Sequence, residues 1–218
     1  AYTAISFAQT GAISSIDPWM YLYFVICALL TVGCYGLIYA FEKLFRFISS
    51  STLVELTDIN SELLHTLAER APGTFQHSMQ VANLSAEVAG KIGAKAQLVR
   101  TGALYHDIGK MERPVFFTEN QSGISPHKHL TPLKSAQVII AHVPNGVALA
   151  EKHHIPEDIK RFILTHHGHS KAKYFYITYK NEHPDEEINE ALFTYPGPNP
   201  TTREQGILML ADCVEAAS

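Results

Sequence analysis

The chain contains one long uncharged stretch, and elsewhere its apolar residues recur every three to four positions. Residues 18–41 hold 24 residues without a charge, enough to cross a bilayer core with some tilt. Trp19 and Tyr39 lie near its two ends, as aromatic residues do at membrane interfaces. Lys43 and Arg46 follow directly, so the positive-inside rule predicts that the rest of the chain faces the cytoplasm. A helix buried in a protein core is the alternative interpretation.

The remaining chain shows the three-to-four-residue apolar spacing of amphipathic helices. Leu53, Leu56, Ile59 and Leu63 follow this spacing, and the pattern predicts a single helix over residues 52–70. The further helices that we expect from spacing and end signals cover residues 74–92, 98–110, 131–144, 145–153, 156–167, 172–180 and 202–217. No segment alternates like a strand, so the sequence predicts an all-α bundle behind one transmembrane helix.

Capping residues and prolines set the expected helix boundaries. Pro72 lies in the break after the first helix, and Thr74 is expected to cap the next one. Thr131 precedes a proline in the favoured cap-then-proline order, and Pro144 is expected to end the helix that begins there. Residues 118–131 are polar and rich in glycine, serine and proline, which indicates a loop.

Composition agrees with a membrane segment followed by one domain. Only 17% of the 218 residues are charged, and 46% are hydrophobic. The 17 basic and 21 acidic residues give a net charge of −4, which excludes the basic footprint of a protein that binds duplex nucleic acid. Three cysteines without regular spacing argue against a disulfide scaffold. We expect an extracytoplasmic loop remnant at residues 1–17, a transmembrane and juxtamembrane segment at 18–48 and a cytoplasmic domain at 49–218, all part of a longer protein.

Five of the twelve histidines and two aspartates are candidate metal ligands: His77, His106, Asp107, His142, His166, His167 and Asp212. They lie in or beside different predicted helices, and a helical bundle can bring such residues to one interior point. Neighbours on a helix diverge by about 100°, so the two adjacent pairs suit two ions better than one. Only a carboxylate bridges two ions with two oxygens, and Asp107 is the natural bridge. The mixture of imidazoles and carboxylates favours iron or manganese over structural zinc, although a lone histidine is more often structural.

The order of these residues, H…HD…H…HH…D, resembles the two-metal form of the HD phosphohydrolase superfamily. More narrowly, the segments APGTFQHS, YHDIGK, YPGP and ILMLADCVEAAS resemble the seven-transmembrane HD proteins of the PgpH type. The resemblance covers residues 18–218. It implies that the uncharged run is the last of several helices in a bacterial cell membrane, with the HD domain in the cytoplasm. It also implies hydrolysis of cyclic di-AMP to linear pApA, and the identity of this substrate rests on the resemblance alone.

The resemblance, together with geometry, assigns roles to the candidate ligands. One divalent ion would take His77, His106, Asp107 and Asp212, and the other would take Asp107, His142, His166 and His167. A hydroxide that bridges two ions, iron or manganese, would attack the phosphorus. We expect Asp107 and Lys110 to be catalytic, because Lys110 lies one helical turn after Asp107 and can reach a bound phosphate. Lys110 and Arg113 are the expected substrate-binding residues, and a solvated cation at a helix end is the alternative for Lys110.

Other functions stay open at this point. A cyclic di-GMP hydrolase of the HD-GYP type would carry a Gly-Tyr-Pro triplet soon after His-His-Glu, whereas Gly168 follows His167 here. A guanosine tetraphosphate hydrolase needs one metal and would not require His142. A non-catalytic nucleotide-binding signalling module is a further alternative, against which the complete ligand set argues. His127 either contacts substrate from the loop or is an exposed residue, and residues 51–70 either couple two chains in a homodimer or cover the core.

Overall fold

The computed structural model describes residue 2, residues 17–45 and residues 48–217. The expected loop remnant at residues 1–17 therefore lies almost wholly outside the described residues, and so do Arg46 and the side chain of Lys43. The chain divides into two compact units, Ala1–Ser49 and Ser50–Ser218.

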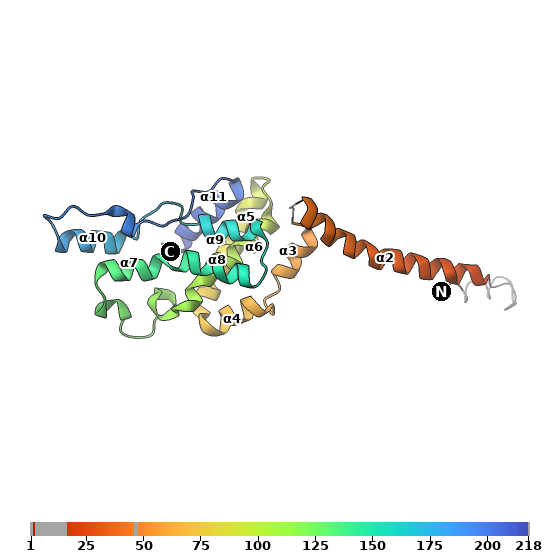
Figure 1. Cartoon of the computed structure of the whole chain (residues 1–218), viewed down its shortest axis with the longest axis horizontal. Coiled ribbons are helices and arrows are strands. Elements are labelled where there is room, and N and C mark those ends of the chain that lie inside the picture. Colours follow the sequence, from red (N-terminus) through yellow and green to blue (C-terminus); the bar gives the residue numbers. More distant parts are fainter. Residues whose placement is uncertain (1, 3–16, 46–47, 218) are drawn as a thin grey trace. The chain divides into compact units, whose positions relative to one another are not determined.

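The first unit contains the long helix α2, which spans Pro18–Phe45 (Figure 1). Proline suits the first position of a helix, and the Asp17 carboxylate accepts a hydrogen bond of 2.9 Å from the backbone N–H of Trp19. The segment Pro18–Glu42 of α2 is long and apolar enough to cross a membrane, and its most apolar part is not buried within the protein.

The second unit is an all-α bundle, as the sequence predicts (Figure 1). Its described α-helices are α3 Ser50–Leu56, α4 Glu62–Arg70, α5 Pro72–Lys91, α6 Ala96–Tyr105, α7 Pro132–Ile140, α8 His142–Lys152, α9 Glu157–Thr165, α10 Lys173–Glu182 and α11 Arg203–Glu215. The short 3-10 helices are η2 Ile108–Glu112, η3 Pro114–Phe116, η4 Thr118–Asn120, η5 Pro126–His129 and η6 Glu190–Phe193. Within the described residues, β-type pairing is limited to one isolated bridge between Lys171 and Thr194.

The bundle core lies between α5, α6, α9 and α11, with α8 packed on α9 and η2. Leu104, Phe162 and Leu208 are fully buried in this core, and burying each such side chain stabilises the fold by about 1.5–3 kcal/mol. A second, smaller apolar cluster around Phe193 joins α7, α10 and η6. The candidate metal ligands lie on or directly after helices that form or pack against the first of these two cores.

The expectation of one helix over residues 52–70 is wrong, because a turn separates α3 from α4. The carboxylate of Asp58 accepts hydrogen bonds from the backbone and side-chain N–H groups of Asn60, an arrangement that competes with the helix. Ile59, which the apolar spacing places on the buried face, is 48% exposed in this turn.

Three other boundaries differ from the expected ones. Pro72 is the first residue of α5, so Thr74 is buried in the first turn instead of capping it. The helix expected over residues 98–110 ends at Tyr105 and gives way to η2. Pro144 does not end α7 but lies in the first turn of α8, where the missing N–H of proline has no intrahelical acceptor to lose. The cap at Thr131 is confirmed, because its hydroxyl accepts a hydrogen bond from the N–H of Lys134.

Candidate metal centre

The structure brings all seven candidate ligands to one interior region from five parts of the bundle. His77 lies on α5, His142 begins α8 and Asp212 lies on α11, while the His-Asp and His-His pairs directly follow α6 and α9. Two groups have nitrogen and oxygen atoms close enough to share an ion: His77, His106 and Asp107, and His142, His166 and His167. Asp212 joins the first group, with Oδ1 3.0 Å from Nε2 of His77.

Asp107 lies between the two groups and presents one carboxylate oxygen to each. Its Oδ2 is 3.2 Å from Nε2 of His106 and 3.6 Å from Nε2 of His77. Its Oδ1 is 3.3 Å from Nε2 of His142 and 3.6 Å from Nε2 of His166. The carboxylate is buried, so this orientation is fixed by the surrounding fold. Asp107 therefore has the geometry that a bridging ligand needs.

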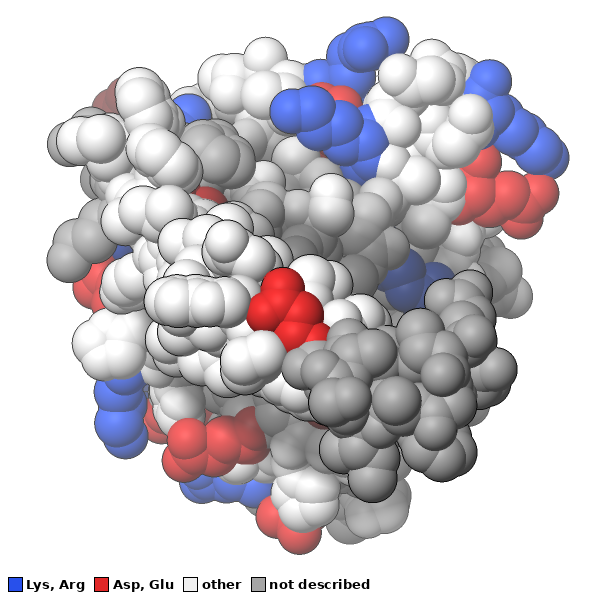
Figure 2. Space-filling view, turned by 90° about the vertical axis from the view of Figure 1, so that its right-hand side faces the viewer, with Lys and Arg blue, Asp and Glu red and all other residues white. Residues whose placement is uncertain are grey.

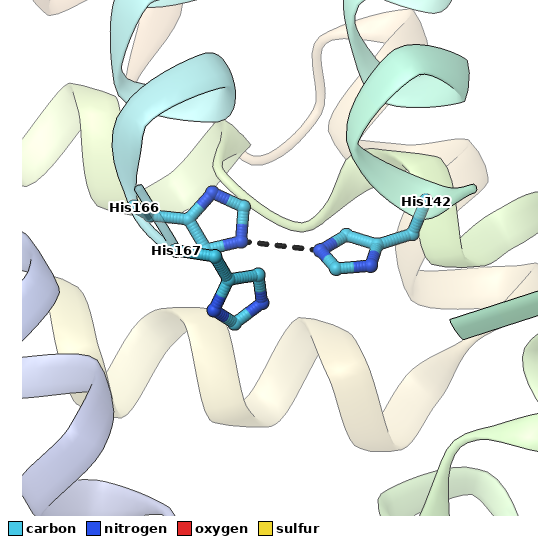
Figure 3. A group of neighbouring side chains, drawn as sticks. All are labelled: His142, His166 and His167. Carbon is cyan, nitrogen blue, oxygen red and sulfur yellow. Dashed lines mark hydrogen bonds between the residues drawn. The ribbon is translucent and has the colours of Figure 1, made fainter. Parts of the chain in front are cut away.

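The backbone fixes the orientation of three imidazole rings. The Nδ1–H groups of His106, His142 and His166 donate hydrogen bonds of 2.6–2.8 Å to the carbonyl three residues earlier. Nε2 of each ring is therefore the nitrogen that is left to bind a metal. The Nε2 atoms of His142 and His166 face each other at 3.1 Å (Figure 3). Two lone pairs at this distance repel, so the geometry calls for a proton or a cation between them.

His167 is held by an aromatic contact. Its ring stacks on Tyr195 with a centroid distance of 4.1 Å and an interplanar angle of 30°. Tyr195 begins the Tyr-Pro-Gly-Pro segment and also contacts the ring of His142 edge-on. The ring of His167 lies beside those of His142 and His166 at the ends of α8 and α9 (Figure 3). Tyr195 therefore orients this half of the site from outside it.

The electrostatics of the two groups differ. Burial disfavours charge on His106, but the carboxylates of Asp107 and Asp212 outweigh it and raise the pKa of His106 to about 10. For Asp107 and Asp212, the neighbouring histidines overcome burial and hold the carboxyl pKa values far below their usual range. Burial lowers the pKa of His142 to about 3, so this imidazole is neutral at pH 7. The first group thus attracts positive charge, whereas His142 in the second group offers a neutral nitrogen donor.

Unsatisfied polar atoms support a metal in this site. Nε2 of His106 and Oδ1 of Asp107 are buried and have no hydrogen-bond partner among the residues that the structure describes. Leaving such a group buried without a partner costs about 1–3 kcal/mol, and more when it is charged. Neutral imidazole nitrogens and carboxylate oxygens are ligands for divalent transition metals. The residues present therefore fit a centre of two divalent ions.

Lys110 lies at the edge of the site. Its ammonium is 2.7 Å from Oδ2 of Asp107 and 2.9 Å from Oε1 of Glu119, and it stands 5.1 Å from the ring centroid of Phe117. These carboxylates outweigh the effect of burial and raise the pKa of Lys110, so the side chain carries a positive charge. It also lines the cavity described next, which keeps it within reach of a ligand there.

A cavity of about 1080 Å³ opens onto the site. Pockets for drug-sized ligands commonly have volumes of about 300–1,000 Å³, so this cavity has room for a ligand of at least that size. His77, Asp107, His142, His167 and Asp212 line it, together with the aromatic side chains Phe116, Phe117, Tyr174, Phe175 and Tyr195.

Arg113 and His127 have different positions relative to this cavity. Arg113 is exposed and borders a separate pocket of about 510 Å³, so its predicted contact with substrate gains no support from the structure and stays a prediction. His127 lines the main cavity, although its Nε2–H donates to the carbonyl of Phe116 and its Nδ1 is buried with no partner in the described part of the chain. The interpretation of His127 as an exposed loop residue is therefore wrong.

A polar network that the sequence did not reveal connects α5 to η4. The side-chain oxygen of Asn120 accepts hydrogen bonds from the N–H groups of Gly73 and Thr74, at 2.9 and 3.2 Å. The hydroxyl of Thr74 donates to Glu119, which also accepts from Lys110. Asn120 thus caps α5 from 46 residues away in the sequence and fixes the turn that precedes His77.

Replacement of Asn120 by alanine is expected to lower the free energy of unfolding by about 1–2 kcal/mol, because the first turn of α5 loses its hydrogen-bond acceptor. Asn120→Asp keeps an acceptor oxygen and adds a negative charge at the helix N-terminus, so it should cost less. Urea unfolding followed by circular dichroism measures both changes. Equal losses for the two variants would contradict the capping role.

Glu215 is a second residue that sequence reasoning missed. Its Oε2 accepts a hydrogen bond of 2.5 Å from Nδ1–H of His77, and its side chain lines the main cavity. A signal was present, because Glu215 follows Asp212 by three residues and therefore lies on the same face of α11.

Comparison with known proteins assigns the chain to a family. Residues 74–217 match the family model of the HD domain, and the chain belongs to this family. The predicted resemblance to PgpH-type proteins is also confirmed.

Two curated relatives are cyclic-di-AMP phosphodiesterases named PgpH. The chain is 46% identical over 183 residues to the protein of Listeria monocytogenes serotype 1/2a (strain 10403S), a match that covers 84% of this chain and 25% of the relative. It is 41% identical over 183 residues to the protein of Bacillus subtilis (strain 168), covering 84% of this chain and 26% of the relative. The chain thus spans about a quarter of the length of the curated relatives it matches.

A solved structure supports the fold assignment. The PgpH HD domain of L. monocytogenes in complex with cyclic-di-AMP superimposes with a TM-score of 0.70 and 46% sequence identity. The match covers 74% of this chain and 75% of that one.

Proposed function

We propose that this chain is the membrane-anchored HD domain of a metal-dependent phosphodiesterase that hydrolyses cyclic di-AMP to linear pApA. The observation that carries the proposal is the position of Asp107, whose two oxygens face two separate groups of imidazoles beside a cavity of about 1080 Å³. The substrate comes from the PgpH relatives, whose names specify cyclic-di-AMP, and from the related HD domain in complex with this dinucleotide.

The chain's own residues provide the binding surface of the proposed reaction. His77, His106, Asp107 and Asp212 would hold one ion, and Asp107, His142, His166 and His167 would hold the other. Two bound divalent ions supply a water nucleophile of lowered pKa and neutralise charge on the phosphodiester. The ammonium of Lys110 lies 2.7 Å from Asp107 and is positioned to bind a non-bridging phosphate oxygen. Iron or manganese remains our choice of metal, because both accept this ligand mixture.

Membrane anchoring by α2 is part of the proposal. The segment Pro18–Glu42 meets the length and composition of a membrane span. Lys43 and Arg46 follow it in the sequence, which supports a bacterial membrane location with the HD domain in the cytoplasm. A homodimer stays a prediction.

The proposed partner is a cyclic dinucleotide and not a nucleic acid duplex. Figure 2 shows one face of the molecule, on which the described basic and acidic side chains are interspersed. A protein that follows a duplex backbone presents a basic stripe, and the described residues on this face form none. The net charge of −4 favours the same conclusion.

The purified full chain in detergent, loaded with Mn²⁺ or Fe²⁺, is expected to convert cyclic di-AMP to pApA and to act more slowly on cyclic di-GMP. Ion-exchange chromatography of the products measures both rates. The enzyme proposal fails if neither dinucleotide is linearised, and preference for cyclic di-GMP would favour the alternative substrate. Elemental analysis should give close to two metal ions per chain, and a value near one would remove the dinuclear centre.

A further inference from the structure

The four histidines that face Asp107 are oriented by two different kinds of partner. His106, His142 and His166 each donate their Nδ1–H to a neutral backbone carbonyl of the preceding turn. His77 instead donates to the carboxylate of Glu215, which is 138 residues away in the sequence. The partner of His77 is thus a charged side chain, and a substitution can change it without altering the backbone.

An outer carboxylate changes the ring that it contacts. It fixes the orientation and tautomer of the imidazole and raises the basicity of the nitrogen that faces the metal. Glu215 is well placed for this role, because Asp212 on the same face of α11 contacts Nε2 of the same ring at 3.0 Å. The imidazole of His77 is therefore held at both nitrogens by residues of one helix.

Glu215 also makes the two halves of the site unequal in charge. The half around His77 and His106 contains one oxygen of Asp107, the carboxylate of Asp212 and the outer carboxylate of Glu215. Lys110 contacts the same oxygen of Asp107, but Glu119 lies 2.9 Å from its ammonium and offsets that charge.

Among the described residues, the carboxylate that contacts the imidazoles of the other half is that of Asp107. His142 and His166 bond to backbone carbonyls, and His167 stacks on Tyr195. A hard divalent cation such as Mn²⁺ gains more from carboxylate oxygens than from imidazoles.

We propose that Glu215 is a positioning residue that makes the half of the centre around His77 bind its metal ion more tightly than the half around His142. The two ions then bind in separate steps, and Glu215 acts on the tighter step. This inference rests on the metal centre of the proposed function, but it makes no use of the substrate.

A titration of the metal-free full chain with Mn²⁺ tests the proposal. The electron paramagnetic resonance signal of free Mn²⁺ reports the ions that remain unbound. We expect two binding steps in the wild-type protein. Glu215→Gln keeps an oxygen that can accept from His77 but removes the charge, and it should weaken the tighter step about 10-fold. Glu215→Ala removes both the acceptor oxygen and the charge, and it should weaken the tighter binding step by up to about 100-fold. The weaker step should be unchanged in each variant.

Two further variants separate this role from a general loss of charge or of structure. Glu182 of α10 lines the same cavity, so Glu182→Gln removes a nearby charge and should leave both steps unchanged. His167→Ala should weaken only the second step, the converse of the Glu215 variants. Thermal unfolding of each metal-free protein shows whether the bundle is intact, and Glu215→Gln is nearly isosteric with the native residue.

The outcomes distinguish this proposal from the proposed function. Unchanged binding in both Glu215 variants, or equal weakening of both steps, would overturn the role of Glu215 and leave the dinuclear centre standing. A wild-type chain that binds fewer than two ions would overturn the metal centre and this inference together. Two-step binding without hydrolysis of either dinucleotide would refute the enzymatic activity but not the role of Glu215.

Discussion

Replacement of Asp107 by alanine is expected to abolish the binding of two metal ions and to reduce turnover of cyclic di-AMP by roughly 10³-fold or more. The physical reason is that Oδ1 faces His142 while Oδ2 faces His106, so one substitution removes a ligand from both halves of the site. It also removes the negative charge that opposes the positive charge of Lys110. Elemental analysis and product chromatography measure the two losses.

A graded variant sharpens this test. Asp107→Asn keeps one carbonyl oxygen but loses the second carboxylate oxygen, so it should bind about one ion per chain and remain inactive. Asp185 is exposed, and Asp185→Asn should leave metal content and turnover at their wild-type values. An Asp107→Ala protein that keeps two ions and its activity would refute the bridging role.

Replacement of Gly109 by alanine is expected to destabilise the fold by about 2–3 kcal/mol, at the upper end of the usual cost of overpacking. A β-carbon at this position would lie 1.9 Å from the carbonyl oxygen of His142 and 2.5 Å from the backbone nitrogen of Gly146. Both atoms belong to the backbone of α8, which cannot rotate away as a flexible side chain can. Relief of the clash must move His142 away from Asp107, so metal binding should weaken as well.

A second glycine provides the matched control. Gly206 lies inside α11, and a β-carbon there would meet no atom within 4 Å. Gly206→Ala should therefore stabilise the protein by about 0.5–1 kcal/mol through helix propensity alone. Chemical unfolding of the two variants should shift in opposite directions. A Gly109→Ala protein as stable as the wild type would show that η2 and α8 do not need this close approach.

Local patterns along the chain account for much of the fold. The uncharged run predicted α2, and the cap-then-proline order at Thr131 predicted the start of α7. Two of the wrong boundaries have a local cause, a side-chain hydrogen bond in one case and an unexpected use of proline in the other. The side chain of Asp58 stabilises a turn where the apolar spacing predicts a helix, and Pro144 begins a helix that it was expected to end.

The sequence likewise predicted some residues of the candidate site and missed others. The order and spacing of the histidines and aspartates pointed to the seven residues that the structure brings together, because a metal centre needs particular residue types near helix ends. Asn120 carries no such mark, and the spacing of Glu215 from Asp212 does not reveal its contact with His77, since each acts on a residue far away in the sequence. Asn120 and Glu215 reach their partners because α5 packs against η4 and α11 in the folded chain.

The sequence alone determined the all-α fold, the apolar span and the types of ligand that the site would contain, because periodicity, capping and residue chemistry are local properties. Only the tertiary structure decided which oxygen of Asp107 faces which imidazole and that Glu215 orients His77. It also placed His127 at the cavity and Arg113 outside it. These features depend on side-chain atoms that approach to within about 3 Å although their helices are far apart in the sequence. No pattern along the chain encodes that distance.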